Sequence, residues 1–168
     1  MMKKLVISVV MLVLLIQLAG AEPLNRTVSK IKQALLLKDY KVLNRQVALE
    51  SIVKAKIRKF SGLLREKRSL MVRTAGRMMQ MSEPVTAKLI TNYILSQYNN
   101  SSLDQRSEFL NTFLPQKISE LEQVAYVSGC FMGAGITIAA ANLDGEWVVV
   151  GVESPLIDNE FKNLLKSL

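Results

Sequence analysis

The stretch Leu143-Asp144-Gly145-Glu146-Trp147-Val148-Val149-Val150-Gly151-Val152 decides the fold class of this chain. An Asp-Gly pair between two runs of strand-forming residues is the strongest short-range signal for a β-hairpin with a two-residue turn. Ile136-Thr137-Ile138 supplies the first strand, and Pro155 ends the second. Because an isolated hairpin is only marginally stable in water, this hairpin must pack against the rest of the chain.

Apolar residues upstream of the hairpin recur at helical spacing. They predict a helix over Arg26–Leu37 and a helical region from Lys41 to Met81, either one helix or two that break at Ser61-Gly62. We favour the break, because glycine inside a helix costs about 1 kcal/mol relative to alanine. Further helix starts are predicted at Ser82-Glu83-Pro84, at Ser102 with Gln105 in capping-box spacing, at Pro115, and at Asp158 as the cap of a final helix. The predicted fold is α+β, mostly helical with about five to seven helices, a C-terminal β-hairpin and a short final helix.

Residues 1–21 have the form of a bacterial secretory signal peptide. Lys3 and Lys4 give a positive start, Leu5–Leu18 is the apolar region, and Ala19-Gly20-Ala21 offers small residues for cleavage after Ala21. The apolar region is shorter than the roughly 20 residues of a bilayer-spanning helix. We therefore expect a single α+β domain over residues 22–168, periplasmic or secreted after cleavage. An uncleaved leader would tether the domain to the inner membrane.

Two compositional facts limit the chemistry. The chain has no histidine, which excludes Ser-His-Asp and Cys-His catalysis and removes the commonest metal ligand. Cys130 is the only cysteine, so we expect a small buried side chain there, with an intermolecular disulfide or a reactive thiol as alternatives. No recognised catalytic motif is present. We expect a non-enzymatic protein without cofactor or metal; the alternative is a hydrolase with a carboxylate pair among Glu108, Glu120 and Glu122.

Positive charge is concentrated in the first half of the predicted domain. Residues 22–97 hold 16 Lys/Arg and 5 Asp/Glu, a balance of +11, whereas residues 98–168 hold 4 and 9, a balance of −5. Such asymmetry indicates an anionic partner, or a helix face neutralised by the acidic half of the same fold. The candidate anion-binding residues are Lys54, Lys56, Arg58, Lys59, Arg65, Lys67, Arg68, Arg73 and Arg77.

Two further segments allow two interpretations each. Val124–Leu143 is uncharged and contains Gly129-x-x-x-Gly133, which fits a buried helix-turn-strand or a membrane-spanning segment. The methionines Met71, Met78, Met79 and Met81 either fill gaps in the core or supply thioether ligands for Cu(I). We favour the buried segment and the core methionines.

Two stretches carry a resemblance. Ala34–Leu43 continuing through Val47–Val53 resembles the opening of a diffuse group of secreted bacterial domains of unknown function. Leu143–Val152 is similar to the closing hairpin of such domains and of cone-shaped α+β folds such as nuclear transport factor 2. The resemblance implies an α+β fold with an apolar pocket between helices and sheet, and no activity.

The predicted function is that of an exported, non-enzymatic binding protein. Its basic helical face would recognise an anionic envelope partner, such as an anionic lipid, lipopolysaccharide or an acidic protein. The alternative is a carrier or chaperone that holds an apolar ligand near Phe131, Met132 and Trp147. Self-association through the hairpin edge or through Cys130 is a further expectation.

Overall fold

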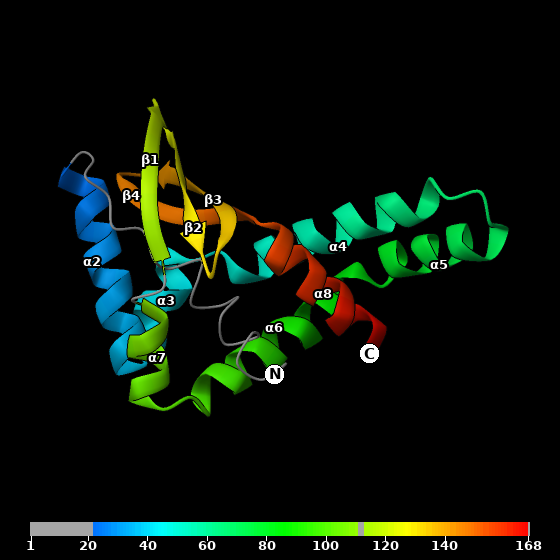
Figure 1. The fold of residues 1–168 in the computed structure, drawn as a ribbon, viewed down its shortest axis with the longest axis horizontal. Helices are drawn as coiled ribbons and strands as arrows, with labels where there is room; N and C mark the ends of the chain where they lie inside the picture. The colour runs from blue at the N-terminus through cyan, green and yellow to red at the C-terminus, as the bar shows by residue number, and fades with distance from the viewer. Residues whose placement is uncertain (1–21, 111–112, 168) are drawn as a thin grey trace.

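The predicted hairpin is the last part of a four-stranded antiparallel sheet. The computed structural model describes residues 22–110 and 113–167, and Figure 1 shows its fold. The strands lie in sequence order across the sheet: β1 (Phe113–Leu121), β2 (Val124–Phe131), β3 (Ala134–Leu143) and β4 (Glu146–Glu153). The predicted signal peptide and its cleavage after Ala21 lie outside the described residues.

Seven helices accompany the sheet in the described ranges, so the predicted α+β class is confirmed. They are α2 (Glu22–Leu37), α3 (Tyr40–Gln46), α4 (Leu49–Arg65), α5 (Leu70–Met81), α6 (Glu83–Asn99), α7 (Leu103–Leu110) and the final helix α8 (Pro155–Ser167). In Figure 1, α4 and α5 lie side by side and extend away from the sheet, while α8 crosses near the middle of α4.

The turn at Asp144-Gly145 has the predicted geometry. Asp144 and Gly145 both have positive φ, 53° and 84°, as a type I′ hairpin turn requires. The turn between β2 and β3 repeats this conformation at Met132 and Gly133, with φ of 47° and 79°. Two such turns explain how β2, β3 and β4 follow one another with short connections.

The helix predicted from Pro115 is wrong. The helix predicted for the first half of the uncharged segment Val124–Leu143 is wrong as well. Residues 113–131 form β1 and β2 instead. Along β2 the side chains alternate between buried and less buried, with Ala125, Val127 and Phe131 facing the core. This alternation is the mark of a strand with one covered face, and it overrides the helical spacing of Ile118, Leu121 and Ala125.

The core lies between the covered face of the sheet and the helices. Val127 pairs with Ile138, and Ala140 pairs with Val149, so one face of three strands is apolar and buried. The helical side contributes buried residues from five helices: Ile31 and Leu35, Leu43, Ile52, Ile57 and Phe60, Ile90 and Ile94, and Ile157 and Phe161. Burial of these side chains is the main term that holds helices and sheet together.

The C-terminus of α2 is closed by two residues from later in the chain. The Tyr98 hydroxyl donates to the Leu35 carbonyl at 2.7 Å, and the Arg106 guanidinium donates to the Leu36 carbonyl at 3.0 Å. Burial raises the pKa of Tyr98 to about 12. Ser102 and Gln105 form the predicted capping box at the start of α7, with distances of 2.9 and 3.2 Å. These contacts fix α2, α6 and α7 relative to one another.

A break at Val47-Ala48 separates α3 from α4, where the sequence pattern predicts a continuous helix. Val47 is extended and forms a parallel bridge with Val149, and the Ala48 amide donates to the Val149 carbonyl at 3.0 Å. Pairing with β4 overrides the local helical preference. The same pairing occupies part of the outer edge of β4, which is the hairpin edge predicted to be available for self-association.

The predicted break at Gly62 is also wrong, since α4 continues to Arg65 and the connection lies over residues 66–69. Open space surrounds the position of a Cβ atom at Gly62. Gly76 on α5 is different, because a Cβ there would lie 2.9 Å from the Ser61 carbonyl oxygen. Gly76 therefore allows α5 to approach α4 closely.

We predict opposite effects of alanine at these two glycines. Gly62→Ala is expected to stabilise the protein by about 0.5–1 kcal/mol, because alanine favours the helix and meets no neighbour. Gly76→Ala gains the same helical preference but places its methyl group against the Ser61 carbonyl oxygen, so it is expected to lower the free energy of unfolding. Urea unfolding of both variants measures the difference; equal effects would contradict the close approach of α5 to α4.

Candidate functional site

The nine candidate anion-binding residues divide into two groups along α4. Lys54, Lys56, Arg58 and Lys59 lie on its first part and pair with carboxylates. Arg65 ends α4, Lys67 and Arg68 lie in the connection, and Arg73 and Arg77 lie on α5. The sequence pattern predicts one continuous basic face, whereas the structure divides it into a neutralised part and a part that lies farther from the sheet.

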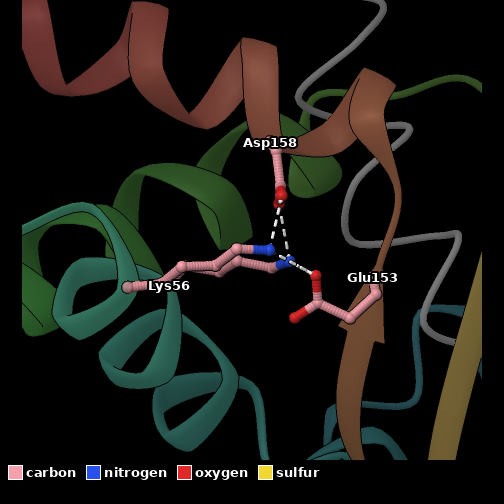
Figure 2. Close-up of polar contacts among 4 residues, drawn as sticks. Lys56, Glu153 and Asp158 are labelled. Carbon is pink, nitrogen blue, oxygen red and sulfur yellow. Dashed lines mark hydrogen bonds and ion pairs between the residues drawn. The ribbon is translucent and has the colours of Figure 1, made fainter. Parts of the chain in front are cut away.

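Lys56 is the most buried of the nine. Its side chain is 5% exposed, and its Nζ lies 2.7 Å from Asp158 Oδ1 and 3.4 Å from Glu153 Oε2. Figure 2 shows Lys56 reaching from α4 to Asp158 on α8 and to Glu153 at the end of β4. Lys59 joins the same carboxylates at 2.6 and 2.8 Å. We call these four residues the lysine network; it makes Lys56 and Lys59 structural.

Asp158 lies in the first turn of α8 and pairs with both Lys56 and Lys59. The helix begins at Pro155, so the prediction that Asp158 is its cap is wrong. Burial opposes ionisation of the Asp158 carboxyl, but the hydrogen bonds from Lys56 and Lys59 outweigh it and lower its pKa. The carboxylate therefore stays charged in the folded protein.

Two other pairs hold candidate residues. Arg58 makes a two-pronged contact with Glu83, at 2.7 and 2.8 Å, which joins α4 to the start of α6 and lowers the pKa of Glu83. Lys54 bridges to Glu50 one turn earlier in α4, at 2.7 Å. Such pairing leaves these cations little capacity for an external anion.

Asp158→Asn tests the lysine network. At neutral pH the variant is expected to lose about 2 kcal/mol of stability, because Lys56 stays buried without its closest carboxylate. The folded pKa of Asp158 is lowered, so its contribution is present above the unfolded pKa and disappears as pH falls through the folded value. The difference from wild type should therefore shrink below about pH 4.

Urea unfolding at a series of pH values measures this difference. Glu50→Gln is the matched control, because it removes the carboxylate of an exposed pair on the same helix and is expected to have little effect. A loss for Asp158→Asn that is independent of pH would contradict the charged pair.

The other five cations form a positively charged end to the α4–α5 hairpin. We call residues 61–81 the distal arm. Arg65 donates to the neutral side-chain oxygen of Gln80 at 2.7 Å. Within the described residues, Lys67, Arg68, Arg73 and Arg77 have no carboxylate within ion-pair distance, and Glu66 is the arm's only acid. The distal arm is therefore the part of the basic stretch that keeps uncompensated charge.

Three arginines of the distal arm surround a shallow hollow. Arg65, Arg73 and Arg77 line it together with Gly62 and Glu66, and its volume is about 390 Å³. Guanidinium groups present paired donors that match the oxygens of phosphate or carboxylate. This hollow is the place where the distal arm can hold an anionic group.

The distal arm also exposes large apolar side chains. Leu70 and Met71 at the start of α5 are 71% and 83% exposed. Met78 and Met81 are 66% and 84% exposed, so the expectation that these methionines fill the core is wrong; Met79 is half-buried. The combination of unpaired cations and exposed apolar side chains distinguishes this surface from a solvated charged face.

The predicted apolar pocket residues are not brought together. Phe131 is buried at the end of β2, where it pairs with Ala134, whereas Trp147 is buried at the start of β4 opposite Asn142. These positions lie at opposite ends of β3. Met132 is 57% exposed in the turn. Phe131 and Trp147 therefore belong to the core packing of the sheet.

The other candidate groups lie on the sheet. Cys130 is half-buried on the face of β2 opposite to Phe131, and its thiol is free. Glu120 and Glu122 are exposed near the β1–β2 turn, while the side chain of Glu108 lies outside the described residues. Val124–Leu143 forms β2 and β3, and no helix in the described ranges combines the length and apolar composition needed to cross a bilayer.

Comparison of the chain with protein-family models, with curated proteins and with solved structures finds no match. The resemblance of Ala34–Val53 and Leu143–Val152 to secreted bacterial domains stays a prediction. The charge and shape of the distal arm are therefore the features that point to a function.

Proposed function

We propose that this chain is an exported, non-enzymatic binding protein whose distal arm recognises an anionic lipid surface. Arg65, Arg73 and Arg77 hold phosphate groups in the hollow between α4 and α5. Leu70 and Met71 enter the boundary between headgroups and acyl chains. The observation that carries the proposal is the coincidence of unpaired cations with exposed apolar side chains on one projecting hairpin.

The charge supports a lipid phosphate as the recognised group. The distal arm carries five cations and one acid, whereas the lysines nearer the sheet are matched by Glu153 and Asp158. Basic residues beside an anionic membrane are each worth about 1 kcal/mol of binding. Five such residues on one arm suffice for binding that depends strongly on salt.

The exposed apolar side chains favour a lipid over an acidic protein surface or a soluble polyanion. Leu70 and Met71 flank the cations at the far end of the hairpin, so they reach a flat surface together with the arginines. Phospholipids and lipopolysaccharide share the chemistry of a phosphate above acyl chains, and the experiment below separates them.

The test is co-sedimentation with vesicles that contain phosphatidylglycerol, and with lipopolysaccharide. We expect binding to the anionic vesicles, and its loss between about 0.1 M and 1 M salt, where the Debye length falls from about 10 to 3 Å. The double variant Arg73→Glu/Arg77→Glu should bind at least roughly thirtyfold more weakly, on the basis of about 1 kcal/mol for each cation. Leu70→Ser/Met71→Ser should weaken binding without changing its salt dependence.

The matched control is Lys30→Glu/Lys41→Glu, which changes the net charge equally at exposed lysines outside the distal arm. Each variant is prepared as the wild type is, so any contribution of residues 1–21 is common to all. Equal weakening by the control would contradict a localised site. Binding only to vesicles of phosphatidylcholine would contradict recognition of an anionic lipid. Binding to poly-glutamate but not to vesicles would contradict it as well. Binding only to lipopolysaccharide would identify lipopolysaccharide as the lipid source.

A further inference from the structure

A second hollow lies on the body side of the distal arm, where three helices meet. Phe60, Leu63 and Leu64 of α4 line it, with Met79 of α5 and Leu165 of α8. Its volume is about 360 Å³. We call it the three-helix pocket. It shares no residue with the arginine-lined hollow, so it is a separate feature of the same hairpin.

The lining of the three-helix pocket has one kind of polar residue. Five side chains are apolar, and the remaining two are Lys67 and Lys162. Lys162 Nζ lies 5.4 Å from the centre of the Phe60 ring, and Phe60 in turn stacks on Phe161. Among the described residues no carboxylate lines the pocket, so both ammonium groups are available to an anion at its rim.

We infer that the three-helix pocket binds the acyl chain of an anionic single-chain amphiphile, with the carboxylate or phosphate headgroup between Lys67 and Lys162. A water molecule inside the pocket would find few polar partners, whereas a hydrocarbon chain is complementary to Phe60, Leu64 and Met79. The inference does not depend on membrane binding by the distal arm.

Size and charge determine the ligand class. The volume lies at the small end of the range of about 300–1,000 Å³ for ligand pockets, which suits one chain and not the two chains of a phospholipid. The two lysines select against a cationic amphiphile and favour an anionic one over a neutral alcohol of the same length. A few placed charges above an apolar lining is the usual composition of a small-ligand site.

The experiment is a titration of the full chain with dodecanoate, and separately with dodecyl phosphate, below their critical micelle concentrations. Calorimetry should give saturable binding, and the methyl resonance of Met79 should shift in NMR spectra while that of Met132 in the β2–β3 turn stays fixed. Dodecyltrimethylammonium is the probe of charge, and inorganic phosphate is the probe of the chain requirement. Each of these two probes should bind at least about tenfold more weakly than dodecanoate and dodecyl phosphate do.

Two variants test the residues. Lys162→Glu changes an exposed side chain and should weaken dodecanoate binding by at least about tenfold, whereas Lys41→Glu should leave it unchanged. Met79→Trp fills the pocket and should abolish binding, with Met132→Trp as its control. Met79→Trp changes the packing of the helices. If Met79→Trp does not fold, the affinity of Lys162→Glu for dodecanoate is the test of the inference.

An unshifted Met79 resonance, equal binding of the cationic amphiphile, or unchanged affinity in Lys162→Glu would overturn the inference. Failure here is distinguishable from failure of vesicle binding. Arg73→Glu/Arg77→Glu leaves the lining of the three-helix pocket intact, and Lys162→Glu leaves the distal arm intact.

Discussion

The burial of Lys56 is the polar constraint that fixes α4 against β4 and α8, beside the apolar core that holds helices and sheet together. A cation with a nearly inaccessible side chain must meet negative charge at close range, because removing it from water without a partner is costly. Asp158 and Glu153 supply that charge from two elements about 100 residues later in the chain. The contact therefore fixes α4 against both the end of β4 and the start of α8, and it determines where the remainder of α4 points.

One helix thus serves two purposes along its length. Its first part is covered by β4, α6 and α8, and its cations are neutralised there. Its last part extends with α5 as the distal arm, held close by the missing side chain at Gly76. The opposite charge of the two halves of the chain is explained in part by the lysine network, since Glu153 and Asp158 belong to the acidic half. Of the nine cations between Lys54 and Arg77, the five without a carboxylate partner among the described residues lie on the arm.

Local signals in the sequence predicted part of this fold. Asp144-Gly145 and the Ser102–Gln105 capping box act within a few residues, so pattern alone identifies them. The pattern predicts a helix where β1 and β2 lie, because alanine, serine, glycine and cysteine along β2 weaken the contrast between its two faces. The break at Val47-Ala48 depends on Val149, about a hundred residues away, and no local pattern carries it.

The sequence predicts which residue types form the candidate site, but not which of its cations remain unpaired. The sequence shows nine cations. Lys54 pairs with Glu50 on the same helix, but the separation of the other eight into paired and unpaired residues depends on carboxylates contributed by β4, α6 and α8. The exposure of Met71, Met78 and Met81 likewise follows from how far α5 lies from the sheet. The sequence pattern does not predict the three-helix pocket, because its lining comes from three helices and includes Lys162 and Leu165 from the end of the chain.

The bridge between Val47 and Val149 has a consequence for assembly. It covers the middle of the outer edge of β4, so among the described strands β1 presents the edge that is available for another strand. Two copies that joined through β1 would form a continuous sheet covered at both ends, and the association would stop at a dimer. A sheet with two free edges would instead grow into a fibre. In such a dimer the bridge between Val47 and Val149 would cover part of each outer edge and limit the addition of a third copy.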